Sequence, residues 1–147
     1  MSLKQSAILL VLAGALVAGG YFLFGGSDRT AKTGAASEAG GAPMVSIDLP
    51  NTLSAAAQAG KRLFDANCIS CHGPNAVGQE ELGPPLVHIV YEPGHHGDES
   101  FQRAVAVGVR AHHWRFGNMA PVEGLSRDDV ALIVAYIREL QRANGIN

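Results

Sequence analysis

The chain has 147 residues, of which 47% are hydrophobic and 16% charged, and its formal net charge at neutral pH is −2. This length suits one domain with appended segments. The nearly balanced charge indicates neither nucleic acid nor an anionic lipid surface as a partner.

The first segment is an uncharged apolar run over residues 7–24. As a helix with a rise of about 1.5 Å per residue it would be about 27 Å long, which is enough to cross a thin bilayer. A cleaved signal peptide is the alternative, but its apolar core is typically only about 7–15 residues long. The run also ends on an aromatic group, residues 21–24, of the kind that suits a membrane interface. We therefore expect a single transmembrane anchor over residues 1–24.

Residues 25–53 are rich in Gly, Ala, Ser and Thr and show no helical or alternating period. Such a composition predicts a flexible linker, with a root-mean-square span of roughly 30 Å for this length. We expect it to tether a folded domain that occupies residues 54–147.

The first element of that domain is a helix predicted over residues 54–68. Ser54 suits the N-cap position, and the three alanines that follow have high helix propensity. Gly60 costs about 1 kcal/mol relative to alanine inside a helix, so we expect it to have a packing role. Phe64, four residues later, lies on the same helix face.

The run from Cys68 to His72 reads Cys-Ile-Ser-Cys-His. Two cysteines two residues apart, followed directly by histidine, form the pattern that attaches a c-type haem. The spacing lets each sulfur bond to one vinyl group of the porphyrin, and the histidine then becomes the proximal ligand of the iron. Cys68 and Cys71 are therefore expected to bind one haem c covalently, with His72 on the iron.

Three other uses of the two cysteines fit less well. A disulfide between them would close a very short loop and would stabilise the protein little. A structural zinc site needs four ligands, and the chain has no further cysteine. A redox-active dithiol expects a strand before the motif, whereas the preceding residues predict a helix.

Further along, residues 73–85 read as a loop because of their glycines and prolines, and residues 98–109 predict a short helix with Asp98 as its cap. Residues 117–124 are again irregular. The last helix is the clearest element, because Ser126 and Asp129 form a capping-box pattern and apolar residues follow at helical spacing. No repeat or useful strand pattern occurs, so the predicted fold class is all-α.

Met119 is the leading candidate for the second axial ligand of the iron. It is the only methionine in residues 54–147 and lies in a loop with Gly117 and Pro121, which could present its thioether rigidly. Methionine often only fills gaps in a core, but core methionines usually lie on periodic elements. The rival ligands are histidines, and His112 and His113 are the nearest of them in sequence to Met119.

Other polar residues have weaker assignments. Trp114 and Arg115 are candidates to contact a haem propionate, because a buried carboxylate needs donors. The alternative is that Trp114 covers the core and Arg115 faces water. His95 and His96 stand between two glycines and are expected at a solvated loop tip, with a chance metal site as a minor alternative.

Taken in order, these features make residues 54–140 resemble the class I cytochrome c family. Gly60 and Phe64 match the glycine and aromatic residue of that family's first helix, and Ile133 and Tyr136 match the pair on its last helix, where the two helices cross. The resemblance implies that the carbonyl group of Pro84 accepts a hydrogen bond from the proximal imidazole and orients it. The run from His112 to Phe116, before the methionine, departs from the simplest family members.

The resemblance, together with the anchor, implies a membrane-tethered bacterial monohaem cytochrome that passes single electrons between redox partner proteins and performs no bond-making chemistry. Its haem domain would lie on the periplasmic side of the inner membrane, where such haems are attached. Two alternatives stay open. One is a haem subunit of a larger oxidoreductase, and the other is a peroxidase or gas sensor in which Met119 is displaced.

Overall fold

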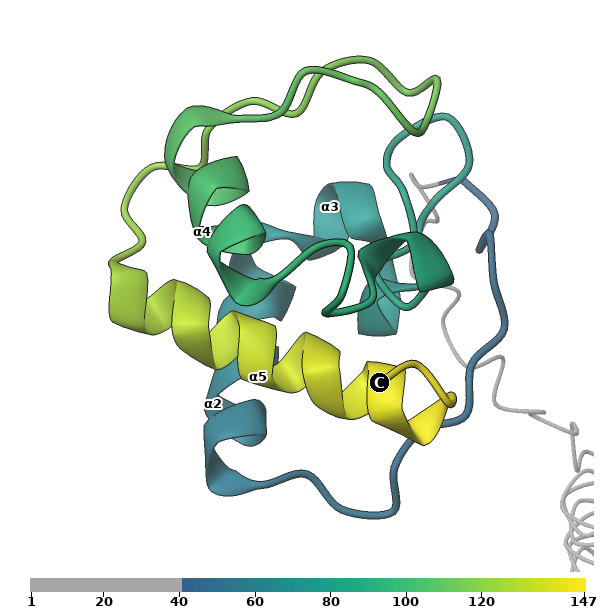
Figure 1. Cartoon of the computed structure of the whole chain (residues 1–147), viewed down its shortest axis with the longest axis vertical. Helices are drawn as coiled ribbons and strands as arrows, with labels where there is room; N and C mark the ends of the chain where they lie inside the picture. Colours follow the sequence, from purple (N-terminus) through teal and green to yellow (C-terminus); the bar gives the residue numbers. More distant parts are fainter. Residues whose placement is uncertain (1–40) are drawn as a thin grey trace, which may run out of the picture. The chain divides into compact units, whose positions relative to one another are not determined.

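The computed structural model describes residues 41–147, and these fold around four α-helices and two short 3-10 helices (Figure 1). The elements are α2 (Ala55–Asn67), α3 (Ile69–His72), η1 (Pro74–Ala76), η2 (Ile89–Tyr91), α4 (Asp98–Val107) and α5 (Arg127–Ala143). Within this part of the chain the only β-type pairings are isolated bridges, so the all-α prediction is confirmed. None of its helices is both long enough and apolar enough to span a bilayer. The predicted anchor, residues 1–24, and the linker up to residue 40 lie outside the described residues.

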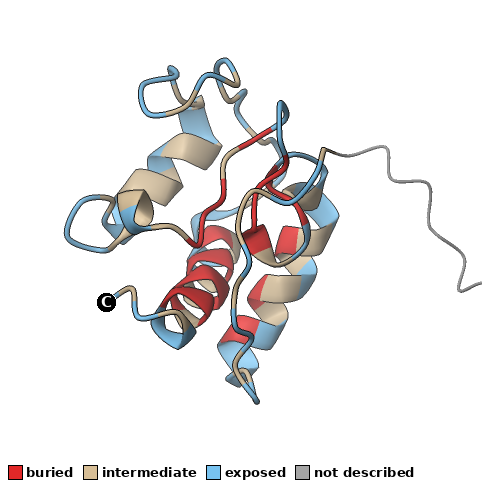
Figure 2. Cartoon of the chain, turned by 90° about the vertical axis from the view of Figure 1, so that its right-hand side faces the viewer, coloured by how far each residue is buried: buried red, intermediate tan, exposed pale blue. Residues whose placement is uncertain are grey.

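The core of the domain is the crossing of α2 and α5, whose facing sides carry most of the buried residues (Figure 2). At the crossing a β-carbon on Gly60 would lie 1.9 Å from the carbonyl oxygen of Leu132. Only glycine allows the two backbones to approach so closely. One turn further along α2, Phe64 meets the ring of Tyr136 edge to face, with the ring centroids 5.7 Å apart.

Local capping determines where these two helices begin. The Ser54 side chain accepts a hydrogen bond from the backbone N–H of Ala57, and it is the N-cap of α2. At the start of α5, Ser126 and Asp129 form both hydrogen bonds of a capping box. Both helix starts agree with the sequence prediction.

The helix α4 differs in detail from the prediction. Its N-cap is Gly97, so Asp98 is the first helical residue and not the cap. There the carboxylate lies at the positive end of the helix and also pairs with Arg138. The helix ends at Val107, two residues early, because Gly108 has a φ of +76° and a β-carbon there would lie 2.5 Å from the Met119 carbonyl oxygen.

Residues 42–53, which the sequence assigned to the linker, contact the helical domain. The carbonyl oxygen of Ala42 accepts a hydrogen bond from the Glu80 N–H, and Asp48 and Asn144 exchange two hydrogen bonds of 2.8 Å each. The side chains of Ile47 and Leu53 pack against the core. Composition did not reveal these contacts, because they depend on partners that are distant in the sequence.

Arg138 on α5 fixes the segment between η2 and α4. Its guanidinium group is buried and donates to the carbonyl oxygens of Tyr91 (2.7 Å) and His96 (2.5 Å), and to the Asp98 carboxylate (2.9 Å). Gln141, one turn later, donates to the carbonyl oxygens of Leu86 and Tyr91. Buried donors with this many partners hold a loop in one conformation.

Candidate functional site

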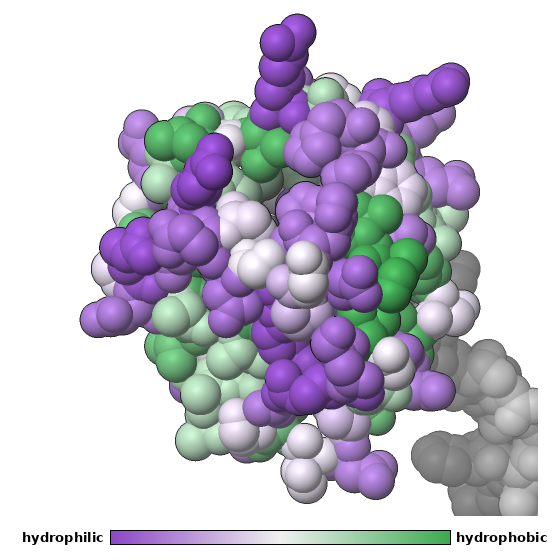
Figure 3. Space-filling view, in the orientation of Figure 1, coloured by the Kyte–Doolittle hydropathy of each residue, from purple (hydrophilic) through white to green (hydrophobic). Residues whose placement is uncertain are grey.

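A cavity of about 790 Å³ lies among the helices. Its walls are the end of α2, α3, the turn at residues 82–86, α4, the loop of residues 108–122 and the facing side of α5. This volume lies within the roughly 300–1,000 Å³ that is usual for small-molecule and cofactor sites. In the space-filling view, apolar groups are exposed between the hydrophilic side chains of the face seen in Figure 1 (Figure 3).

Both cysteines line this cavity as free thiols. Burial, with a contribution from Cys71, raises the pKa of the Cys68 thiol to about 11. A thiol that stays protonated at neutral pH is a poor nucleophile and a poor redox dithiol. Cys68 is therefore poorly suited to disulfide exchange, and both sulfurs are free for a bond to a group in the cavity.

His72 also lines the cavity and is only 9% exposed. Its Nδ1–H donates a hydrogen bond of 2.8 Å to the carbonyl oxygen of Pro84, which leaves Nε2 as the unprotonated nitrogen. Burial lowers the pKa of His72 despite the opposing effect of this hydrogen bond, so the neutral imidazole is favoured. A neutral, oriented imidazole is the form that binds a metal ion.

The loop after the motif holds these residues in place. Gly73 ends α3 at a φ of +71°, and the buried side chain of Gln79 donates to the carbonyl oxygen of Ile69 over 2.8 Å. A β-carbon on Gly83 would lie 2.7 Å from the Cys71 carbonyl oxygen, so the Gly83-Pro84 turn sits directly on the motif.

Met119 lines the same cavity from the 108–122 loop. Its backbone forms an antiparallel bridge with Val109, with reciprocal N–H to carbonyl hydrogen bonds of 2.9 and 3.0 Å. This pairing anchors the Met119 backbone although the loop has no regular secondary structure. Met44, the other methionine in the described residues, has its sulfur beside Gly78 and does not line the cavity.

Trp114 lies in the cavity wall with its indole Nε1–H buried and without a hydrogen-bond partner. Its ring stacks on Phe116 and meets His88 edge to face. A buried donor without an acceptor is costly, so this N–H fits an acceptor that belongs to a group bound in the cavity.

Arg115 is not among the residues that line the cavity. Two other arginines, Arg103 on α4 and Arg110 after it, are among the residues that line the cavity, although both are exposed like Arg115. Neither was expected from the sequence. Their spacing from the haem motif carries no signal, and only the fold brings them to the cavity.

Four histidines lie close together beside the cavity, and His96, His112 and His113 belong to its lining. His95 is exposed, as expected for a solvated loop tip, whereas His96 is half-buried. Nε2 of His95 lies 3.4 Å from Nε2 of His113, and the His112 and His113 rings have centroids 4.3 Å apart. Partial desolvation and the neighbouring imidazoles lower the pKa of His113. The rings of His96 and His113 are 5.3 Å apart by centroid.

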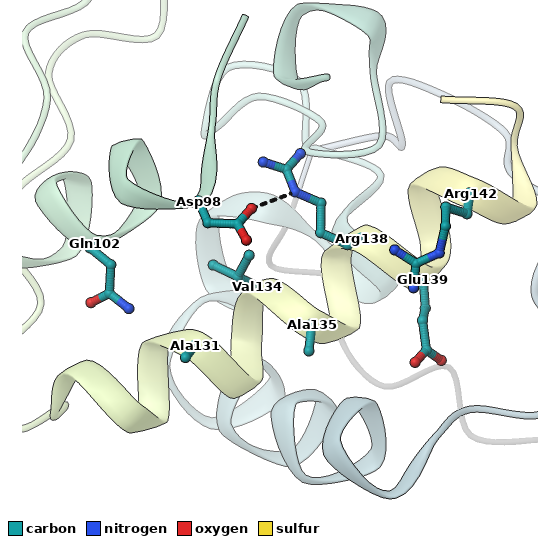
Figure 4. Close-up of a pocket in the computed structure, with 8 residues that line it drawn as sticks. All are labelled: Asp98, Gln102, Ala131, Val134, Ala135, Arg138, Glu139 and Arg142. Carbon is teal, nitrogen blue, oxygen red and sulfur yellow. Dashed lines mark hydrogen bonds and ion pairs between the residues drawn. The ribbon is translucent and has the colours of Figure 1, made fainter. Parts of the chain in front are cut away.

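A second and smaller pocket, of about 290 Å³, lies between α4 and α5 (Figure 4). Its lining includes the ion pair of Asp98 and Arg138, drawn as a dashed line, together with the small side chains of Ala131 and Ala135. The guanidinium group of Arg138 already has protein hydrogen-bond partners, so it is not free to bind a ligand in this pocket.

Comparison with known sequences decides the family. Residues 57–141, more than half of the chain, match the Cytochrome c family. The chain belongs to the cytochrome c family. As a class I cytochrome c it carries covalently bound haem c, and its function is electron transfer.

Curated relatives share shorter stretches with this cytochrome c. A Cbb3-type cytochrome c oxidase subunit CcoP from Azospirillum brasilense is 45% identical over 49 residues, which are 30% of this chain and 17% of that protein. Cytochrome bc1 complex cytochrome c subunits from Mycobacterium bovis and Mycobacterium tuberculosis are each 47% identical over 36 residues, which are 24% of this chain and 13% of theirs. The matched part is thus less than a fifth of each relative's length. No solved structure gives a significant match.

The cavity residues suit haem c on three independent grounds. Two free thiols and an oriented imidazole stand together in the lining. The apolar side of α4, with Phe101, Ala104 and Val105, lines the cavity, and no residue of α4 is buried by the protein alone. The unpartnered Trp114 N–H suits a carboxylate acceptor.

Proposed function

We propose that this cytochrome c is a membrane-tethered carrier of single electrons, in which His72 and Met119 ligate the iron of one haem attached through Cys68 and Cys71. The observation that carries the proposal is the shared cavity lined by both cysteines, the oriented histidine and the methionine. A bound haem c supplies one-electron redox chemistry at its iron.

Different backbone contacts position the two proposed axial ligands. Nε2 of His72 is available because Nδ1–H is committed to the Pro84 carbonyl oxygen. Met119 is positioned through its backbone bridge to Val109, and Gly108 permits the close approach of the two segments. Ligands that are already fixed need little rearrangement when the iron changes oxidation state, which favours rapid electron transfer. A thioether ligand also raises the reduction potential.

The remaining wall residues would bind the cofactor and exclude water. The apolar side of α4 would cover one part of it, and Trp114 would donate its N–H to a propionate. Arg110 and Arg103 are better placed than Arg115 to pair with the propionates, because they line the cavity. Because protein groups would fill both axial positions, we propose a carrier and not an enzyme.

The location and partners rest on the sequence and on the relatives. The apolar run of residues 1–24 would anchor the chain in the bacterial inner membrane, with the haem domain in the periplasm. The relatives are named as subunits of a cytochrome c oxidase and of a cytochrome bc1 complex. We therefore propose respiratory redox proteins as donor and acceptor.

The relatives also support a second candidate, a haem subunit that stays bound in a larger oxidoreductase, because both kinds are named as subunits of complexes. Solubilisation in mild detergent distinguishes the two. A mobile carrier is extracted from the membrane without a partner protein, whereas a permanent subunit is recovered with a stoichiometric partner.

The proposed function is tested by a redox titration of the purified full-length holoprotein, with cyanide and carbon monoxide added in parallel samples. We expect a reversible one-electron transition and no ligand-induced spectral change, because both axial positions are occupied. Ready binding of either ligand to the native protein would instead indicate a peroxidase or gas sensor with a displaceable methionine.

A further inference from the structure

The histidines beside the cavity have a geometry that the electron-carrier function does not use. His95, His96 and His113 each offer one ring nitrogen, and the three nitrogens lie within 4.8 Å of one another. The first two belong to the segment between η2 and α4, and the third belongs to the loop that leads to Met119. The cluster therefore joins two loops that are distant in the sequence.

We propose that His95, His96 and His113 form a binding site for a divalent transition-metal ion of the zinc type, separate from the haem iron. Three imidazoles with an open fourth position for water are a ligand set that zinc accepts. Imidazole also suits copper and nickel, whereas Mg²⁺ and Ca²⁺ prefer oxygen ligands.

One distance in the cluster already matches a coordination site. Nitrogen ligands at about 2.0–2.1 Å from a tetrahedral zinc ion stand about 3.3 Å from each other. Nε2 of His95 and Nε2 of His113 are 3.4 Å apart. The ligand nitrogen of His96 lies within 4.8 Å of the other two, so it must approach them by at most about 1.5 Å to reach the separation in a tetrahedral site.

The third ligand, His96, is oriented by a hydrogen bond on its other ring nitrogen. Nδ1–H of His96 donates a hydrogen bond of 2.6 Å to the carbonyl oxygen of Val90, so Nε2 carries the free lone pair. Metal-binding histidines usually have such a partner on the second nitrogen, since it fixes the tautomer and makes the ring a better ligand. The His96 carbonyl oxygen in turn accepts a hydrogen bond from the buried Arg138.

Both loops are held by the fold and not only by the histidines. Arg138 and Gln141 fix the segment around Tyr91 and His96. On the other side, the N–H of Ala111 donates to the Asn118 side chain over 2.9 Å, which closes the loop that carries His113. A site that exists before the metal arrives loses less entropy on binding.

His112 provides a matched comparison. It is exposed like His113 and adjacent to it, and its Nδ1–H donates to the Arg110 carbonyl oxygen over 2.8 Å. It is not one of the three residues whose nitrogens come together. A nonspecific affinity of a histidine-rich surface would depend on His112 as much as on its neighbour, but the proposed site would not.

The experiment is a calorimetric titration of Zn²⁺ into the full-length holoprotein, in which both thiols are already bonded to haem, with bound metal measured after dialysis. We expect one Zn²⁺ per chain. His95→Asn and His113→Asn should each weaken binding by at least about tenfold, because even the loss of an outer-shell partner costs about 10–100-fold in metal affinity. Both side chains are exposed, and an unchanged haem spectrum will show that the variants fold.

His112→Asn is the control and should retain the affinity of the native protein. The proposal is overturned if the native chain retains no Zn²⁺, or if His112→Asn loses as much affinity as His113→Asn. It is also overturned if neither His95→Asn nor His113→Asn weakens binding. His113 is also one of the histidines that rival Met119 as second ligand of the haem iron, so an unchanged haem spectrum in His113→Asn is required to show that the lost zinc affinity does not come from the loss of an axial ligand.

Discussion

The Nδ1–H of His72 donates to the carbonyl oxygen of Pro84 over 2.8 Å, so a loop twelve residues later orients the imidazole of the haem motif. The turn that supplies this carbonyl group can approach only because residue 83 is glycine. A β-carbon there would lie 2.7 Å from the Cys71 carbonyl oxygen. The proximal geometry thus depends on a backbone contact as well as on the motif itself.

Gly83→Ala tests this dependence. We expect the substitution to push the turn away from the motif and to destabilise the holoprotein by about 1–3 kcal/mol, the usual cost of overpacking. Thermal unfolding followed at the haem absorbance measures the loss. A variant with native stability and a native spectrum would show that the turn does not position His72.

Gly60→Ala tests the crossing of α2 and α5. Alanine favours a helix by about 1 kcal/mol over glycine, but here its β-carbon would lie 1.9 Å from the Leu132 carbonyl oxygen. The clash should outweigh the gain in helix propensity. We therefore expect the free energy of unfolding, measured with denaturant, to fall by about 1–3 kcal/mol. Gly94→Ala is the control, because a β-carbon at Gly94 meets nothing within 4 Å. Equal stability of the two variants would contradict the close helix contact.

We predict that the protein loses stability at alkaline pH because of Tyr136. Burial, with a smaller effect of Asp65, raises the pKa of its hydroxyl to about 12 from an ordinary value of 10, and its O–H donates to the Asn75 side chain over 3.0 Å. The side chain is only 1% exposed. Because the folded-state pKa is raised, this stabilisation is complete below pH 10 and is lost as the pH rises toward 12.

Tyr136→Phe should remove that alkaline loss, which we expect to be on the order of 2 kcal/mol. The same variant should be slightly less stable at neutral pH, by about 0.5–1.5 kcal/mol, because it lacks the hydrogen bond to Asn75. Denaturant unfolding of both proteins between pH 8 and 12 measures the difference. Parallel stability curves over this range would exclude Tyr136 as the titrating group.

Two truncated chains test how much residues 42–53 contribute to stability. A chain that begins at Gly41 keeps the contacts of Ala42 with Glu80 and of Asp48 with Asn144, whereas a chain that begins at Ser54 loses them. The loss of Ile47 and Leu53 from the core surface adds to this effect. We expect the shorter chain to be less stable by about 1–3 kcal/mol, with an unchanged haem spectrum. Equal thermal midpoints would show that residues 42–53 contribute nothing.

The sequence predicted those parts of the fold that depend on local signals. Ser54 and the Ser126–Asp129 capping box mark helix starts through contacts within one turn, and their roles are visible in the residues themselves. Asp98 was assigned to the cap position, but Gly97 occupies it. The error arose because Asp98 also satisfies Arg138, forty residues away, and such a partner leaves no mark in a local pattern.

In the site, too, only the features that depend on local signals could be predicted from the sequence. The spacing of Cys68, Cys71 and His72 specifies its chemistry directly, since the vinyl groups of the porphyrin require it. The meeting of His95 with His113, and the approach of Arg103 and Arg110 to the cavity, follow from tertiary packing. The two glycines around His95 and His96 predicted a solvated loop, and His95 is exposed, but no local pattern indicated that its ring meets that of His113.

The proposal that Met119 is the second ligand of the haem iron is tested most directly by the near-red absorbance of the oxidised full-length protein, where a thioether bound to ferric haem gives a weak charge-transfer band. We predict that the band is present in the native protein and in Met44→Leu, whose sulfur lies beside Gly78 and outside the cavity lining, and that it is absent in Met119→Leu. A native protein without the band, or a Met119→Leu variant that keeps it, would contradict the proposal.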